Sequence, residues 1–304
     1  MLKLVFSAGG VEQRVMRGVR VDLFFLDLDG VIIMLSSATH LFRFRGDNIN
    51  TINELVNNEI WHSKISGLND PFDMFFNFDA EELRRLDKAD VATIIKDTNF
   101  LKVHRQAVEE CFYKNELEPI YKYITEFWGA DFVNNLLNDF HKSIATACFT
   151  KKYDSRLMWG YYGNGMKGLC LAYNKEKLTA SGIEFSDVIY TNEAPKINIY
   201  KHLLEKMRGE PVTMNGGFSL VKHSDWEHEE EVRSLQHKKG DDIYERLPGF
   251  AVPLQGRCID AIIIGERLAG DMRVFIENFA KNNDIEILIA KADFTNYRIQ
   301  LDSK

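Results

Sequence analysis

Apolar residues recur along this chain in short stretches, many of them bounded by turn residues, as in partly buried β-strands. The pattern predicts strands at residues 41–45, 59–63, 144–149, 168–173, 187–190, 259–265, 285–290 and 297–301. A helix is expected at residues 50–58, between the first two strands, with Asn48 or Asn50 as its N-cap. Two more helices are expected at residues 199–207 and 271–282.

A different pattern fills the stretch from about residue 80 to 142. Val133, Leu137 and Phe140 recur at the spacing of one buried helix face. Pro119 suits the first turn of a helix, where its missing N–H is not needed. This stretch is therefore predicted to be all helical.

Strands and helices follow one another without a regular βαβ alternation, which favours an α+β fold over a doubly wound α/β fold. We expect a mixed, mostly antiparallel β core. The expected organisation is an N-terminal extension, residues 1–38, followed by a single α+β domain, residues 39–304. The all-helical stretch at about residues 80–142 would be an insertion in that domain.

Composition and charge narrow the function classes. The chain is 45% hydrophobic and 27% charged, as ordinary globular proteins are. Its net charge of −7 gives no strong nucleic-acid signature. The four cysteines form no CxxC pair, so no zinc site and no disulfide framework are expected. The apolar stretch at residues 23–35 is too short to span a membrane. We expect a cytoplasmic protein that binds neither membrane nor metal.

One motif near the N-terminus points to another chemistry. Phe25-Leu-Asp-Leu-Asp-Gly-Val31 resembles the first motif of haloacid-dehalogenase-type phosphatases. In those enzymes the first Asp, here Asp27, is the nucleophile, and the second, here Asp29, is the acid/base beside a magnesium ion. Gly240-Asp-Asp242 imitates the later acidic motif, but no apolar strand precedes it. A phosphatase is the third hypothesis, and a translation start at Met34 would remove its motif.

Seven short motifs follow one another between residues 41 and 233. They are Leu41-Phe-Arg-Phe-Arg45, Trp61-His-Ser63, Leu68-Asn-Asp-Pro-Phe-Asp73, Cys148-Phe-Thr150, Leu157-Met-Trp-Gly-Tyr-Tyr-Gly163, Gly168-Leu-Cys-Leu-Ala-Tyr173 and Trp226-Glu-His-Glu-Glu-Glu-Val-Arg233. In this order they resemble an uncharacterised bacterial and phage domain-of-unknown-function family. That family has Leu-Tyr-Lys-Tyr-Arg, Phe-Asn-Asp-Pro-Phe-Asp, Cys-Phe-Ser, Met-Trp-Ser-His-Tyr and Trp-x-Tyr-Glu-x-Glu-x-Arg. Two positions depart from it: Tyr161 replaces a frequent His, and His228 a frequent Tyr.

The order of elements in that family is similar to that of ADP-ribosyltransferases. Those enzymes have a first strand with a basic residue, a helix, a strand ending near an aromatic residue and a Ser, and a late carboxylate motif. The likeness implies an ADP-ribosyltransferase-like enzyme that uses NAD as its substrate, in a toxin or an anti-phage defence system. The alternative is a non-catalytic sensor or regulatory domain of unknown ligand. The sequence does not identify the target, whether macromolecule or small molecule.

The late carboxylate motif supplies the expected catalytic residues. Cleavage of the nicotinamide–ribose bond passes through an oxocarbenium-like state, which a nearby carboxylate stabilises. On an extended strand Glu229, Glu231 and Arg233 would point to one face. We expect Glu231 to be catalytic, with Glu229 as its partner and Arg233 offsetting their repulsion. If a helix from the Ser224-Asp-Trp-Glu227 capping box ran on instead, Glu229 and Arg233 would form an i,i+4 ion pair without a function.

The remaining expected cofactor-binding residues lie on the early strands and in the Leu157–Gly163 motif. Arg43 and Arg45 share one strand face and would bind pyrophosphate or ribose; otherwise that face is simply solvated. Ser63, Trp159 and Tyr162 complete the set, with the aromatic rings stacking on the leaving group unless they belong to the core. The enzyme hypothesis requires that Arg43, Arg45, Glu229 and Glu231 converge on one pocket.

Overall fold

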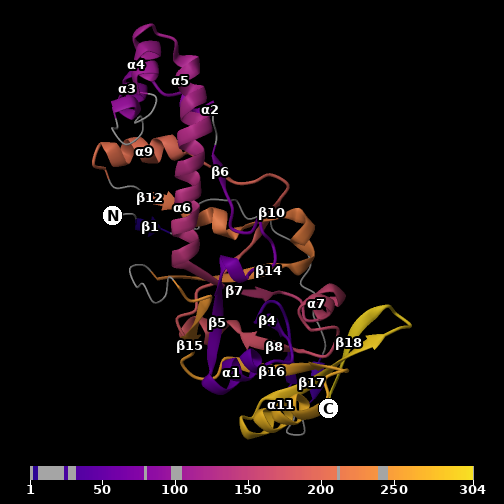
Figure 1. Cartoon of the computed structure of the whole chain (residues 1–304). Coiled ribbons are helices and arrows are strands. Elements are labelled where there is room, and N and C mark those ends of the chain that lie inside the picture. Colours follow the sequence, from indigo (N-terminus) through magenta and orange to yellow (C-terminus); the bar gives the residue numbers. More distant parts are fainter. Residues whose placement is uncertain are drawn as a thin grey trace. The chain divides into compact units, whose positions relative to one another are not determined.

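The computed structural model describes residues 3–5, 24–26, 32–78, 81–96, 105–210, 213–238 and 246–303. The chain divides into two compact units (Figure 1). The first comprises Met1–Val11, Asp70–Ser143 and Thr191–His223, and the second Glu12–Asn69, Ile144–Tyr190 and Ser224–Lys304. Residues 27–31 and 239–245, which hold the phosphatase-like motif and its acidic counterpart, lie outside the described part of the chain. The division into an extension and one domain stays a prediction.

The first unit is mainly helical and contains the helices expected between residues 80 and 142. Its helices are α2 (Glu81–Arg84), α3 (Lys88–Lys96), α4 (Arg105–Tyr113), α5 (Leu117–Tyr123), a π-helical turn η2 (Ile124–Gly129), α6 (Ala130–Ser143), α9 (Ile199–Met207) and the short 3₁₀ helix η3 (Gly216–Leu220). Two small parallel ladders pair β1 (Lys3–Val5) with β12 (Thr213–Asn215), and β6 (Asn77–Phe78) with β11 (Lys196–Ile197). As expected, Pro119 lies in the first turn of α5.

An aromatic cluster centred on Phe218 packs the first unit. The ring centroid of Phe218 lies 4.6 Å from that of Phe140 on α6 and 4.7 Å from that of Phe76. Val133 and Leu137 are buried on the same predicted face of α6 as Phe140. The helical spacing read from the sequence therefore identified one buried face correctly.

The second unit is built on a large sheet. Its elements are β4 (His40–Arg45), α1 (Ile49–Asn57), β5 (Glu59–Lys64), η1 (Ile65–Gly67), β7 (Ile144–Thr150), α7 (Arg156–Tyr161), β8 (Leu169–Asn174), α8 (Lys175–Ala180), β9 (Ser186–Asp187), η4 (Ser224–Glu229), β14 (Glu231–His237), β15 (Gly249–Pro253), β16 (Ile259–Gly265), α11 (Gly270–Asn282), β17 (Glu286–Asp293) and β18 (Arg298–Ser303). A separate hairpin pairs β2 (Phe24–Leu26) with β3 (Ile32–Met34).

Ten strands form this sheet within the described residues. Eight follow the order β15-β5-β7-β4-β8-β16-β17-β18, and β14 pairs with β7 and with β9. Neighbours are antiparallel, apart from the parallel pair β16 and β17. The predicted α+β class with a mixed, mostly antiparallel core is confirmed. The strand expected at residues 187–190 is divided between β9 and β10 (Ile189–Thr191).

Caps fix α1 at both ends. The side chain of Asn48 accepts hydrogen bonds from the backbone N–H groups of Asn50 and Thr51, at 3.0 and 3.3 Å. Asn48, rather than Asn50, is therefore the N-cap. Asn58 ends the helix with a left-handed φ of 51°, a conformation that asparagine tolerates better than most residues.

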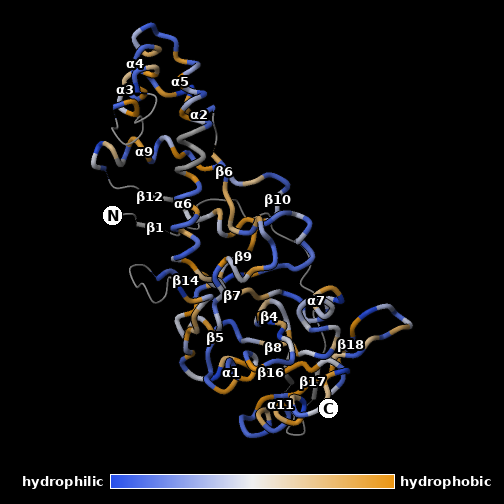
Figure 2. Tube along the Cα trace, viewed as in Figure 1, coloured by the Kyte–Doolittle hydropathy of each residue, from blue (hydrophilic) through white to orange (hydrophobic). Residues whose placement is uncertain are grey.

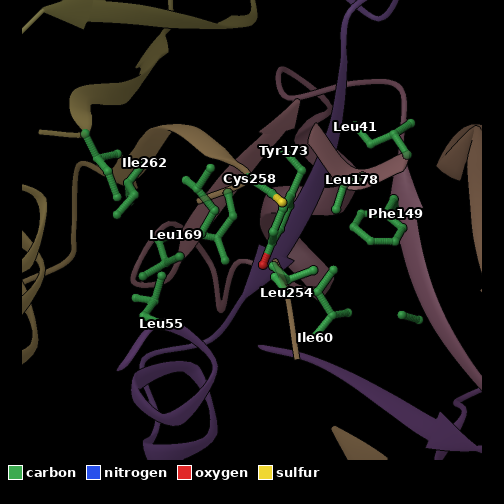
Figure 3. Close-up of a cluster of buried hydrophobic side chains, with 14 of the residues drawn as sticks. Leu41, Leu55, Ile60, Phe149, Leu169, Tyr173, Leu178, Leu254, Cys258 and Ile262 are labelled. Carbon is green, nitrogen blue, oxygen red and sulfur yellow. The ribbon is translucent and has the colours of Figure 1, made fainter. Parts of the chain in front are cut away.

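Both faces of the large sheet are buried, which explains the continuous apolar run of β16. On one face a cluster that includes Leu41, Leu171 and Ile262 packs against Leu55 of α1 and against α8 and α11 (Figure 3). On the other face Phe42, Phe44, Cys170 and Ile263 pack against Met158 and Trp159 of α7. Figure 2 shows the hydrophobic colour along β16 and β17. In the described part of the chain, no helix combines the length and apolar character needed to cross a membrane.

Candidate functional site

The late carboxylate motif does not form one continuous strand. Ser224–Glu229 is a 3₁₀ helix, so the helical turn expected from the capping box is present. Glu230 then has a φ of 42°, a left-handed value that is strained for a residue with a side chain, and β14 starts at Glu231. Strand alternation therefore applies to Glu231 and Arg233 but not to Glu229. The prediction that all three share one strand face is wrong, and so is the continuous-helix alternative.

Glu231 and Arg233 form a buried, two-pronged ion pair. Arg233 Nε donates to Glu231 Oε1 at 2.8 Å, and Arg233 Nη2 donates to Oε2 at 3.0 Å. The side chains are 4% and 0% exposed. Both carboxylate oxygens of Glu231 thus face a fixed guanidinium that neutralises them. This geometry stabilises the start of β14 and turns the carboxylate of Glu231 inward.

Glu229, by contrast, accepts a hydrogen bond from Tyr162, the C-cap residue of α7. The Tyr162 hydroxyl donates to Glu229 Oε1 at 2.6 Å, and Asn69 Nδ2 donates to the same hydroxyl at 2.8 Å. The backbone of Glu229 is also fixed, because Thr150 Oγ1 donates to its carbonyl at 2.6 Å. Glu229 is buried and Tyr162 is half-buried. The result is an ordered relay from an amide through a phenol to a carboxylate.

Arg43 and Arg45 are occupied by a glutamate of α1. Arg43 Nη2 lies 3.2 Å from Glu54 Oε1 and donates to the Trp61 carbonyl at 2.8 Å. Arg45 Nε lies 2.6 Å from Glu54 Oε2. Burial, then the charge of Arg43, lowers the pKa of Arg45. The Arg43 guanidinium also lies 5.5 Å from the centroid of the Phe149 ring. Arg43 is therefore a buried structural residue whose charge is paired within the protein.

Strand register shows that Arg43 and Glu231 point to opposite faces of the sheet. Phe42 lies opposite Thr150, and Thr150 lies opposite Glu231, so these three side chains share one face. Arg43, one residue further along β4, points to the other face. The expected convergence of both arginines and both carboxylates on one pocket therefore does not occur.

A polar pocket of about 540 Å³ opens where β4 ends. Its wall is formed by the end of β4, the loop into α1, the end of α7 and the loop after α7. The lining residues are Phe44, Arg45, Gly46, Asp47, Asn48, Asn50, Tyr161, Tyr162 and Asn164. We call it the tyrosine pocket. Of the predicted site residues, Arg45 and Tyr162 line it, and Glu229 reaches it through its hydrogen bond to Tyr162.

The loop after α7 gives the pocket its shape. Asn164, Gly165 and Met166 all have left-handed φ values, of 49°, 63° and 70°. The Asn164 side chain donates to Asp47 at 2.6 Å, which joins this loop to the one that follows β4. Gly168 lies so close to the end of β4 that a Cβ there would be 2.3 Å from the Arg45 carbonyl oxygen. Backbone strain of this kind is characteristic of functional loops.

Two predicted binding residues have structural positions. Trp159 is 1% exposed, its ring meets Phe44 edge-on at 5.0 Å, and its indole N–H donates to the Tyr153 carbonyl at 2.8 Å. It therefore belongs to the core. Ser63 Oγ accepts a hydrogen bond from the Trp61 indole at 3.1 Å. Ser63 lies on β5, which β7 separates from β4 in the sheet. Neither residue lines the pocket.

An aromatic series leads from η4 to the tyrosine pocket. Trp226 stacks on His228, with ring centroids 6.1 Å apart, and His228 meets Tyr161 at 6.4 Å. Tyr161 in turn contacts Tyr162. Tyr161 and His228, the two positions singled out in the sequence, are therefore in contact.

Sequence reasoning missed several of the residues that form the site. Glu54 was not singled out, although its place on α1 opposite two arginines makes it their partner. Asn69 Nδ2 donates to the Tyr162 hydroxyl, which is 93 positions away in the sequence. The only signal for Asn69 was its place in the Asn-Asp-Pro motif. Within the described residues no group of three or more His, Cys, Asp or Glu side chains is arranged to bind a metal ion.

Comparison with known proteins adds a family to this geometry. Residues 158–234 match the model of a family described as Protein of unknown function (DUF2971). This segment is therefore similar to an uncharacterised family. The matching residues include both members of the Tyr162–Glu229 pair and the Glu231–Arg233 pair, and exclude Arg43 and Arg45. No curated protein and no solved structure matches the chain.

Proposed function

We propose that the chain binds a nucleotide-sized ligand in the tyrosine pocket and, with NAD as that ligand, acts as an ADP-ribosyltransferase-like enzyme. The observation that carries the proposal is the 2.6 Å hydrogen bond from Tyr162 to Glu229 at a pocket of about 540 Å³. Pockets for small molecules and cofactors usually have volumes of about 300–1,000 Å³. The polar lining fits a ligand rich in hydrogen-bonding groups.

The lining suits the nicotinamide riboside end of NAD better than its pyrophosphate. Asn48, Asn50 and Asn164 offer neutral amides, which pair with hydroxyl and carboxamide groups. Tyr161 is 66% exposed and presents a ring on which a nicotinamide could stack. Arg45 is the cation of the lining, and its charge is offset by Glu54. A strongly charged diphosphate would therefore lie toward solvent.

Glu229 is the carboxylate placed for the chemistry. As the nicotinamide–ribose bond breaks, its electron pair leaves with nicotinamide, and positive charge develops on the ribose. A fixed carboxylate stabilises that charge without reorganising, and Tyr162 and Thr150 hold Glu229 in place. Glu231 has its charge neutralised by Arg233. The proposal therefore assigns to Glu229 the role that the sequence suggested for Glu231.

Binding and turnover of NAD test the proposal separately. We expect isothermal titration to show NAD binding, and chromatography to show nicotinamide release. Glu229→Gln should reduce nicotinamide release by 100-fold or more while NAD still binds, since it removes the stabilising charge. Tyr162→Phe should reduce release less, because the carboxylate stays charged. Glu230→Gln is the matched control, since Glu230 pairs with Lys152 instead and should leave release unchanged. Failure of NAD to bind would overturn the proposal.

A non-catalytic sensor is the second candidate. The ion pairs within the protein favour it, because Glu54 neutralises Arg43 and Arg45, and Arg233 neutralises Glu231. Residues that are paired in this way stabilise the fold and need no catalytic role. A sensor would bind its ligand in the tyrosine pocket, change its thermal stability and release no nicotinamide. NAD binding without turnover, equal in the wild type and in Glu229→Gln, would establish this candidate and refute the enzyme.

A further inference from the structure

A hydroxyl, an imidazole and a carboxylate form a relay at the other end of β4 from the tyrosine pocket. Thr39 Oγ1 lies 2.9 Å from His40 Nδ1, and His40 Nε2 lies 3.1 Å from Asp260 Oδ2. Thr39 is exposed, whereas His40 is 4% exposed. The hydroxyl thus faces solvent while the imidazole behind it is held in the protein.

Asp260, in β16, is fixed as an acceptor. Asn174 Nδ2 donates to its Oδ2 at 2.9 Å, and Lys177 Nζ donates to its Oδ1 at 2.6 Å. Burial alone would raise the pKa of Asp260, but the hydrogen bonds from His40, Lys177 and Asn174 outweigh it, and the pKa is lowered. The carboxyl group is therefore ionised at neutral pH, and it can only accept hydrogen bonds.

The ionised carboxylate determines the tautomer of His40. Because Asp260 only accepts, the contact at 3.1 Å requires a proton on His40 Nε2. In the neutral ring Nδ1 then carries a lone pair, and this lone pair faces the Thr39 hydroxyl. The other acceptor of that hydroxyl, the Ser36 carbonyl, is more distant, at 3.4 Å. His40 is thus oriented as a base for Thr39.

We propose that Thr39 is a nucleophile that His40 activates toward small carboxylic esters, with Asp260 positioning the imidazole. Thr39 Oγ1 would attack the ester carbonyl carbon while its proton passes to His40 Nδ1. The carbon–oxygen bond to the alcohol then breaks, and His40 returns the proton to the departing alkoxide. Attack of a water on the acyl-threonine, with the same proton transfers, releases the carboxylic acid and restores the threonine.

This site is independent of the tyrosine pocket. Its residues, Thr39, His40 and Asp260, are not among those that line the pocket, and no nucleotide takes part in the step. The turn that carries Thr39 is also anchored, because Lys175 Nζ donates to the Ser37 carbonyl at 2.6 Å and the Lys175 N–H donates to the Thr39 carbonyl at 2.9 Å. The hydroxyl is therefore presented from a fixed backbone.

The test uses the full chain and p-nitrophenyl acetate as the probe. We expect p-nitrophenol release, with acetylation mapped to Thr39 by peptide mass spectrometry. Thr39→Ala should abolish this acetylation, and His40→Gln should slow it by about 100-fold or more, the usual contribution of a general base. Thr179→Ala is the matched control, since its exposed hydroxyl donates to a backbone carbonyl, that of Lys175, at 2.9 Å.

Two further measurements examine the imidazole of His40, and the first uses the unaltered protein, so that it does not depend on the folding of a variant. Nitrogen-15 chemical shifts of His40 should show the proton on Nε2, and Asp260→Asn should shift the tautomer equilibrium and the pH–rate profile of acetylation. Acetylation of Thr39 no faster than that of Thr179, or a proton found on Nδ1 of His40 in the wild type, would overturn the proposal.

Discussion

Replacing Glu231 by Gln removes a negative charge that pairs with Arg233, a buried cation on β14. Arg233 is 0% exposed, and both of its hydrogen bonds to Glu231 run to a carboxylate at 2.8 and 3.0 Å. Glutamine keeps the shape of the side chain but offers one acceptor and no charge. The guanidinium then stays buried beside a neutral amide.

The expected cost is large. Removing one partner of a buried ion pair typically lowers stability by about 3–5 kcal/mol, because the remaining charge is uncompensated. Since glutamine keeps one acceptor, we expect a loss near the lower end, about 3 kcal/mol. A typical domain has only about 5–15 kcal/mol of stability, so the loss should be easy to measure.

Urea unfolding followed by tryptophan fluorescence is the suitable assay. Three of the four tryptophans, Trp61, Trp159 and Trp226, belong to the second unit, which holds the ion pair. Glu230→Gln removes a neighbouring, more exposed carboxylate and serves as the control, with an expected change below about 1 kcal/mol. The double variant with Glu231→Leu and Arg233→Met should recover much of the loss, because neither residue of this pair then carries a charge.

The outcome separates a structural from a catalytic role for Glu231. If the free energy of unfolding of Glu231→Gln lies within about 0.5 kcal/mol of the wild-type value, the pair does not stabilise the fold and the reasoning from burial is refuted. A stable Glu231→Gln variant that releases no nicotinamide would return the catalytic role to Glu231.

Three further predictions concern local features of the second unit. Burial lowers the pKa of His62 to about 4 from 6.5, so its ring stays neutral in the folded state. The neutral His62 should therefore contribute its full share to the free energy of unfolding above pH 6.5. Between pH 6.5 and pH 4 this contribution should fall by about 1.4 kcal/mol per pH unit, about 3 kcal/mol in all. Urea unfolding of the wild type and of His62→Gln at pH 7 and pH 5 would measure the loss. Gly168→Ala should lower the melting temperature, with a cost of about 1–3 kcal/mol, because its Cβ would press on the Arg45 carbonyl. Asn48→Ala should cost about 1 kcal/mol in the same urea assay through loss of the α1 cap.

Local patterns were enough to predict most of the secondary structure. The strand and helix that surround Asn48 follow from alternation and from a capping side chain, and both signals act over a few residues. The apolar run at residues 259–265 likewise predicted β16, which the structure shows to be buried on both faces. Such features depend on neighbouring residues, so the sequence contains them directly.

The arrangement of the site could not be predicted in the same way. One left-handed residue, Glu230, interrupts the alternation that would have aligned Glu229 with Glu231. The position of Arg43 depends on which strand lies beside β4, and its partner Glu54 comes from a helix that folds back over that strand. Register and packing partners are long-range properties, and a single sequence records them only weakly.

The sheet order has a consequence for how the family match should be understood. Both neighbours of β8, namely β4 and β16, lie outside residues 158–234, and so does β7, the long partner of β14. A peptide cut at those limits would expose both edges of β8 and the edge of β14 that faces β7, and should aggregate rather than fold. Residues 158–234 are thus not an autonomous folding module, because the strands that complete their part of the sheet lie outside the matching stretch.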